Sequence, residues 1–146
     1  MKPMMTKACV LLADDDPAVR ASLRQVLEQE GYSVLLATNG DEAIAVAARA
    51  PVDLVLLDLN MPKKNGWDAF ERLTNNNPLL PIVVITARPN QLFTALAAGV
   101  EALLEKPLDI PELLVAIDEA LHESPEARLA RRAGKKTEFR YSPAHV

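Results

Sequence analysis

Residues 10–20 read VLLADDDPAVR, an apolar run that ends in three consecutive aspartates and a proline. The run has no apolar/polar alternation, as expected for a strand that is covered on both faces of a parallel sheet. Asp16 followed by Pro17 indicates a helix start, because aspartate caps free backbone N–H groups and proline fits the first helical position. This stretch therefore predicts a buried strand that ends in carboxylates and leads directly into a helix.

The same strand-and-helix unit recurs along the chain. The expected strands are residues 8–13, 33–37, 52–57, 82–85 and 102–104, and the expected helices are 17–30, 41–50, 66–75, 90–98 and 110–122. Strict alternation of strands and helices indicates a parallel sheet with right-handed crossovers. We therefore predict an α/β fold: a doubly wound, flavodoxin-like, five-stranded parallel sheet of order 2-1-3-4-5 with helices on both faces.

Length and composition restrict the class of protein. The 146 residues are 49% hydrophobic and 25% charged, which is ordinary for one soluble globular domain. The single cysteine, Cys9, cannot form an internal disulfide. The early apolar run, residues 8–13, is too short for a signal peptide or a membrane span. We expect a cytoplasmic protein.

Charge is distributed unevenly along the chain. Residues 1–123 carry 18 acidic and 10 basic side chains, a formal charge of −8, whereas residues 124–146 carry 2 and 6, a charge of +4. We expect a folded domain over 1–123 and a basic C-terminal tail over 124–146. One interpretation of the tail is an arm that contacts an anionic partner; the favoured one is a solvated, partly disordered extension.

Polar side chains end the predicted strands at one edge of the sheet. They are Asp14, Asp15 and Asp16 after the first strand, Asp58 after the third, Thr86 after the fourth and Lys106 after the fifth. The first and third strands are neighbours at the topological switch point, so Asp15 and Asp58 should approach closely. A divalent cation would relieve their repulsion. Magnesium suits this all-oxygen set better than zinc.

Four stretches carry a resemblance to a known family. They are VLLADDDPAVR (10–20), VDLVLLDLNMPKKNG (52–66), IVVITA (82–87) and LLEKPL (103–108). Over roughly residues 7–123, the chain resembles the receiver domain of two-component response regulators. Asp58 takes the place of the aspartate that accepts a phosphoryl group from a histidine kinase or histidine phosphotransfer protein. The resemblance implies that Asp15 ligates Mg²⁺ directly, Asp14 through water, and Asp58 and the Asn60 backbone carbonyl complete the protein ligands.

The resemblance also assigns roles around the phosphoryl group. Lys106 would pair with the phosphoryl oxygens, Thr86 would donate its hydroxyl to them, and the Lys106–Pro107 peptide bond would be cis. The implied function is a stand-alone, phosphorylation-dependent switch that alters protein–protein interactions. No enzyme activity is expected beyond self-directed phosphoryl transfer and autodephosphorylation, and no direct DNA binding by the receiver domain. The downstream protein is not identified by the sequence.

Two alternatives stay open. Leu103 stands where receivers usually carry a tyrosine or phenylalanine that moves with the threonine, so the chain could be a degenerate receiver that binds a partner without phosphorylation. The other is a hydrolase with an aspartate nucleophile. Such enzymes carry a second aspartate two residues after the nucleophile, where this chain has Asn60, which cannot serve as their acid or base.

Overall fold

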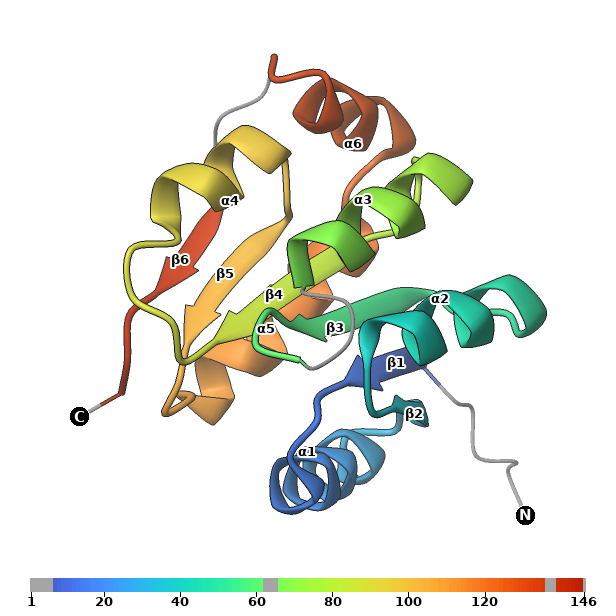
Figure 1. The fold of residues 1–146 in the computed structure, drawn as a ribbon, viewed down its shortest axis with the longest axis vertical. Coiled ribbons are helices and arrows are strands. Elements are labelled where there is room, and N and C mark those ends of the chain that lie inside the picture. Colours follow the sequence, from blue (N-terminus) through green and yellow to red (C-terminus); the bar gives the residue numbers. More distant parts are fainter. Residues whose placement is uncertain (1–6, 62–65, 136–138, 146) are drawn as a thin grey trace.

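The computed structural model describes residues 7–61, 66–135 and 139–145, in which strands and helices alternate up to α5 (Figure 1). The strands are β1 (Cys9–Ala13), β2 (Ser33–Ala37), β3 (Leu54–Asp58), β4 (Ile82–Thr86), β5 (Ala102–Glu105) and β6 (Arg140–Ser142). The helices are α1 (Pro17–Gln29), α2 (Gly40–Arg49), α3 (Gly66–Asn76), α4 (Leu92–Ala98), α5 (Ile110–His122) and α6 (Pro125–Arg132).

All neighbouring strands pair in parallel, in the order β2-β1-β3-β4-β5-β6. The predicted order of the first five strands is confirmed, and β6 extends the sheet by one strand beyond β5. Strand β1 lies between β2 and β3, so the chain reverses its direction of winding there. This switch point places the carboxyl ends of β1 and β3 side by side.

Two apolar layers cover the two faces of the sheet. Ala43 of α2, Phe70 of α3 and Ala95 of α4 belong to one layer. Leu27 of α1 and Ile117 of α5 belong to the other. The central strands β3 and β4 are buried along their whole lengths. A sheet covered in this way leaves only its ends accessible to a ligand.

Local chemistry fixes where the helices begin. The Asp16 carboxylate accepts hydrogen bonds from the N–H groups of Ala18 and Val19, so the predicted cap of α1 is confirmed. Helix α3 begins at Gly66 against the end of β3. A Cβ atom at this position would lie 2.3 Å from the Cα of Leu59. Only glycine therefore lets α3 start this close to Asp58.

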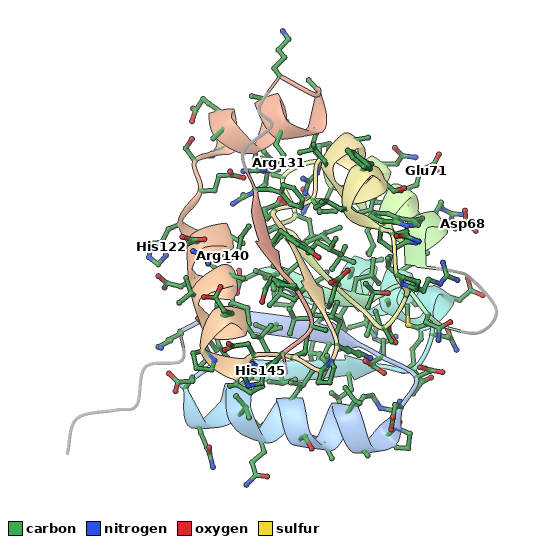
Figure 2. The ribbon with its side chains drawn as sticks, turned by 90° about the vertical axis from the view of Figure 1, so that its left-hand side faces the viewer. Asp68, Glu71, His122, Arg131, Arg140 and His145 are labelled. Atoms are coloured by element: carbon green, nitrogen blue, oxygen red, sulfur yellow. The ribbon has the colours of Figure 1, made fainter. Side chains whose placement is uncertain are left out.

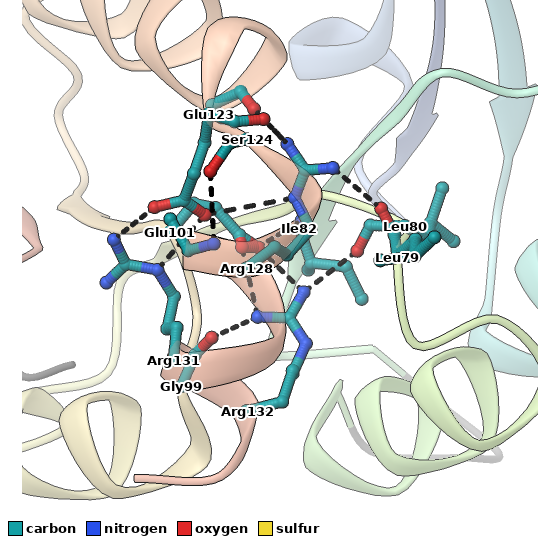
Figure 3. A network of polar contacts seen from close by, with 12 residues as sticks. Leu79, Leu80, Ile82, Gly99, Glu101, Glu123, Ser124, Arg128, Arg131 and Arg132 are labelled. Carbon is teal, nitrogen blue, oxygen red and sulfur yellow. Dashed lines mark hydrogen bonds and ion pairs between the residues drawn. The ribbon is translucent and has the colours of Figure 1, made fainter. Parts of the chain in front are cut away.

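The segment after α5 requires a correction. The favoured expectation was a solvated extension, but its described residues form α6 and β6, which pack on the rest of the fold. Arg128 donates to the carbonyls of Leu79 and Ala120, and Arg132 forms a bidentate pair with buried Glu101 (Figure 3). Buried guanidinium groups with carboxylate and carbonyl partners fix this helix in place. Placing the domain boundary at Ser124 stays a prediction.

The same contacts change the interpretation of the basic charge. Arg131 pairs with Glu123 at 2.6 Å, and Arg140 pairs with Glu112 and Glu119, both at 2.7 Å. Figure 2 shows Arg131 and Arg140 on the same side of the molecule, with Arg140 beside α5. Side chains that are engaged within the fold are poorly placed to attract an anionic partner. The sequence could not reveal these pairings, because their carboxylates come from other elements.

No helix among the described residues has both the length and the apolar character needed to span a membrane.

Candidate functional site

The carboxylates predicted to meet at the switch point do so. Ala13 of β1 pairs with Leu57 of β3, so the next residues, Asp14 and Asp58, lie side by side where the two strands end. Ligand oxygens from Asp14, Asp15 and Asp58 all lie within 4.8 Å of one another. Asp14 is fully buried, Asp58 is 2% exposed, and Asp15 is exposed to solvent. The cluster is thus open to ligands on the Asp15 side.

Lys106 brings a positive charge to this cluster from the end of β5. Its Nζ lies 2.7 Å from Oδ2 of Asp14 and 3.5 Å from Oδ2 of Asp58. The backbone N–H of Lys106 donates to the carbonyl of Thr86 at 2.7 Å, which holds the lysine beside β4. The peptide bond from Lys106 to Pro107 is cis, as predicted. Three carboxylates facing one ammonium group leave an excess of negative charge.

Asp14 is held in a single orientation by its neighbours. Its Oδ1 accepts the N–H of Asp16 at 2.9 Å, and its Oδ2 accepts Lys106 Nζ. The Arg20 guanidinium donates to the Asp14 backbone carbonyl at 2.7 Å. Both carboxylate oxygens of Asp14 therefore already have donors, whereas Asp15 stands at the solvent side. This arrangement favours Asp15 over Asp14 as a direct metal ligand.

Burial and charge shift the protonation equilibria of the cluster. Burial raises the pKa of Asp58 above its ordinary value, and the nearby Asp14 and Asp15 charges add to this, while the Asn60 N–H and Lys106 oppose it. Burial lowers the pKa of Lys106, but the hydrogen bond to Asp14 and the charge of Asp58 outweigh it, so the net pKa is raised. Lys106 is therefore a cation at neutral pH, and the surroundings of Asp58 disfavour its ionised form.

The other predicted site residues surround Asp58. The backbone N–H of Asn60 donates to Oδ1 of Asp58 at 3.1 Å, which fixes the turn after β3. Thr86 is fully buried, and its hydroxyl accepts the Arg88 N–H at 2.9 Å. In this structure the Thr86 hydroxyl thus accepts a hydrogen bond from the backbone of the loop after β4. Residues 62–65 of the quoted motif lie outside the described part of the chain.

The residues present fit a magnesium ion. Mg²⁺ binds oxygen ligands, uses one or two carboxylates and keeps several waters, which matches a half-open cluster of three aspartates. Its two positive charges would offset the excess negative charge around Asp58. The donor set contains no thiolate or imidazole that would favour zinc.

The strain on ionised Asp58 leads to a prediction about stability. Asp58→Asn should raise the metal-free free energy of unfolding at neutral pH, since a raised pKa means that folding disfavours the charged form. The penalty is complete above the folded-state pKa and disappears as pH falls below the ordinary value of 3.8. Urea unfolding in EDTA at two pH values measures the difference. An Asp58→Asn protein less stable than the wild type at neutral pH would contradict this prediction.

Comparison with known proteins places the chain in a family. The response regulator receiver domain family matches residues 10–118. The chain is 42% identical over 110 residues to the response regulator MprA of Mycobacterium leprae, which is 74% of this chain and 48% of that protein. It is 38% identical over 122 residues to the transcriptional regulatory protein GlrR of Escherichia coli, 82% of this chain and 28% of that protein.

Solved structures agree with this placement. A CheY-like receiver domain from Methanospirillum hungatei has a TM-score of 0.74 at 30% identity, covering 78% of this chain and 93% of that one. The response regulator TrrA of Thermotoga maritima, solved in complex with Mg²⁺ and beryllium fluoride, has a TM-score of 0.73 at 26% identity, covering 77% and 98%. The chain therefore belongs to the response regulator receiver domain family. It spans about a quarter to a half of the length of the curated relatives above.

Proposed function

We propose that this chain is a phosphorylation-dependent switch in which Asp58 accepts a phosphoryl group from a histidine kinase or a histidine phosphotransfer protein. One observation carries the proposal: the nearly buried Asp58 carboxylate meets Asp14, Asp15 and Lys106 at the end of the sheet. The carboxylates around Asp58 carry more negative charge than Lys106 can neutralise, so the site is suited to bind Mg²⁺. A phosphoryl group can then be accepted beside the bound cation and the lysine. Membership of the receiver family supports the same role.

The transfer needs positioning more than covalent assistance. An Oδ atom of Asp58 attacks the phosphorus of phosphohistidine, the P–N bond breaks, and its electron pair returns to the imidazole of the donor. The product is an acyl phosphate on Asp58. Lys106, which now bridges Asp14 and Asp58, would pair with the phosphoryl oxygens. Bound at the aspartate cluster, Mg²⁺ would supply neutralisation of the phosphoryl charge.

Thr86 would gain a partner in this scheme. Its hydroxyl accepts from Arg88, so it is free to donate its own proton to an oxygen. We propose that it donates to the phosphoryl group once Asp58 is modified. Residues Thr86 and Lys106 are joined through a backbone hydrogen bond of 2.7 Å, so the ends of β4 and β5 would respond together.

The surface beside Lys106 suits an approaching donor. A largely apolar hollow of about 540 Å³ lies between the start of α1 and the loop into α5, lined in part by Val19, Leu23, Leu108 and Ile110. A donor protein must place a histidine at the end of the sheet, and this hollow offers apolar surface immediately beside the acceptor. We propose that the donor docks there, in the cytoplasm. Several relatives are named as DNA-binding or transcriptional regulators, but the receiver domain itself is proposed to act through proteins.

The two alternatives are weaker than this proposal. A hydrolase would need an acid or base at position 60, and an asparagine side chain is neither; the contact of Asn60 to Asp58 is made by its backbone N–H. A degenerate receiver is suggested by Leu103, which is fully buried and has no hydroxyl. Since Asp14, Asp58 and Lys106 are all in place, the acceptor chemistry does not depend on Leu103.

An incubation with a small acyl phosphate donor and Mg²⁺ tests the function. Intact-mass measurement should show the wild type gaining one phosphoryl group, and EDTA should prevent the gain. Asp58→Asn should lose it completely, whereas Asp118→Asn, an exposed aspartate on α5, should keep it. A wild type that stays unmodified but still binds a partner would support the degenerate receiver. Continuous turnover of phosphate esters that Asp58→Asn abolishes would support the hydrolase.

A further inference from the structure

Strand β6 and the residues after it contact the chain on both sides of the site lysine, at the outer edge of the sheet. Tyr141 pairs in register with Leu103 of β5, and its hydroxyl donates to Oε1 of Glu105 at 2.8 Å. The backbone N–H of His145 donates to the carbonyl of Pro107, also at 2.8 Å. These two contacts fall on the residues immediately before and after Lys106. The segment 139–145 is therefore attached to the part of the chain that carries the site lysine.

The two parts of the segment after α5 are held with different strength. Helix α6 is anchored by the largely buried pairs of Arg131 with Glu123 and Arg132 with Glu101, whose side chains are at most 11% exposed. Strand β6 has only three residues. Its Arg140 pairs with Glu112 and Glu119, whose side chains are 41% and 55% exposed. Exposed ion pairs contribute little to stability. Phe139 packs on the core and Ser142 is buried, but among its ion pairs β6 has none as well covered as those of α6, so we take it as the less firmly held of the two.

Tyr141 of β6 contacts a neighbour of the site lysine and is also exposed at the surface, whereas its register partner on β5 is not exposed. Leu103 is fully buried, so it presents no side chain to solvent. Tyr141, its register partner, is 39% exposed and at the same time contacts Glu105. The hydrogen bond to Glu105 raises the pKa of Tyr141 above its ordinary value, in keeping with a hydroxyl that donates to this carboxylate.

Phosphorylation of Asp58 would affect the contacts between β6 and the residues beside Lys106. Lys106 Nζ lies closer to Asp14 than to Asp58, at 2.7 Å against 3.5 Å. A phosphoryl group on Asp58 adds negative charge and attracts the ammonium group toward it. Glu105 and Pro107 flank Lys106 in the chain and carry the contacts to Tyr141 and His145, so a shift of the backbone at Lys106 would disturb both contacts.

We propose that β6 is a displaceable strand, docked on β5 in the unmodified protein and loosened when Asp58 carries a phosphoryl group. This inference rests on the proposed function. Its consequence is an open edge on β5, whose unpaired backbone groups can bind a strand of a partner protein. Coupling is reciprocal: if loading the site favours the opening of β6, weakening the contacts of β6 must favour loading.

Hydrogen exchange of the full-length chain, with and without Mg²⁺ and beryllium fluoride, tests the coupling. Amides of residues 140–142 should exchange about fivefold faster in the loaded protein, while those of α6 stay unchanged. Tyr141→Phe, which removes only the hydroxyl, should tighten beryllium fluoride binding by a few fold. Tyr32→Phe is the matched control, because Tyr32 precedes β2 at the opposite edge of the sheet.

The possible results separate this inference from the proposed function. If the wild type binds beryllium fluoride but β6 exchange and the affinity of Tyr141→Phe both stay unchanged, the coupling is wrong and the acceptor function stands. If the wild type neither binds beryllium fluoride nor gains a phosphoryl group, both fall together. Faster exchange that spreads equally to α6 would indicate global loosening and would also overturn the inference.

Discussion

Glu101→Ala is expected to lower the free energy of unfolding by about 3 kcal/mol, because it leaves a buried arginine without its carboxylate. Glu101 is 6% exposed, and its carboxylate accepts hydrogen bonds from both Nη atoms of Arg132, at 2.7 and 3.0 Å. The same carboxylate accepts the Ile82 N–H at 3.0 Å, at the start of β4. The substitution therefore removes the partner of α6 and a backbone contact of the central sheet together. Urea unfolding followed by circular dichroism measures the loss.

The matched control is another carboxylate that pairs with an arginine of the same segment. Glu112 accepts Arg140 Nη1 at 2.7 Å, but its side chain is 41% exposed. An exposed pair of this kind contributes about 0 to 1 kcal/mol. Glu112→Gln should therefore leave the unfolding midpoint almost unchanged. Equal effects of the Glu101 and Glu112 substitutions would contradict the assignment of α6 as a buried, structural element.

Gly66→Ala should have a comparable effect for a steric reason. The added Cβ would lie 2.3 Å from the Cα of Leu59, 2.8 Å from its Cδ2 and 3.0 Å from the carbonyl oxygen of Asp58. Two of these atoms belong to the backbone, so helix α3 must move away from the end of β3. We expect a loss of about 3 kcal/mol, at the upper end of overpacking penalties. We also expect weaker Mg²⁺ binding, since the turn after Asp58 is disturbed.

Gly134→Ala separates steric clash from backbone conformation. Gly134 has a φ of 75°, but nothing lies within 4 Å of its added Cβ. Its substitution should cost only the strain of the left-handed conformation, about 1 kcal/mol. Thermal unfolding and Mg²⁺ titration of both variants provide the comparison. Gly66→Ala with wild-type stability and metal affinity would show that α3 does not need its close approach to Leu59.

Most of the fold and the positions of the site residues followed from local patterns. Apolar runs predicted five strands to within about two residues of their observed ends. The carboxyl ends of parallel strands share one edge, so Asp15, Asp58 and Lys106 could be expected to meet. Their contacts confirm that geometry. The roles assigned to them in phosphoryl transfer stay predictions.

The segment after α5 shows where local patterns were insufficient. The Ser124 hydroxyl caps α6 and Pro125 occupies its first helical position, but no helix was expected there. The arginines, however, suggested a solvated surface, because charged side chains are rarely buried without partners. Their partners, such as Glu101 and the Leu79 carbonyl, are distant in sequence. Only the tertiary arrangement shows that these charges are satisfied inside the fold.

The orientation of Thr86 was also beyond the reach of the sequence. Its place at the end of β4 could be predicted, but its contact with the Arg88 N–H depends on the conformation of the following loop. In the same way, Leu103 indicated a missing aromatic group without indicating that Tyr141 lies beside it. Register between β5 and β6 is a long-range property that no local window contains.

Peptide mapping of the full-length chain after reaction with a small acyl phosphate donor and Mg²⁺ tests the central claim most directly. We expect a single phosphoryl group, located on Asp58 and labile as an acyl phosphate. The group should be absent from Asp58→Asn, and its formation should slow strongly in Lys106→Met. A phosphoryl group on any other residue, or no modification of a correctly folded wild type, would contradict the account.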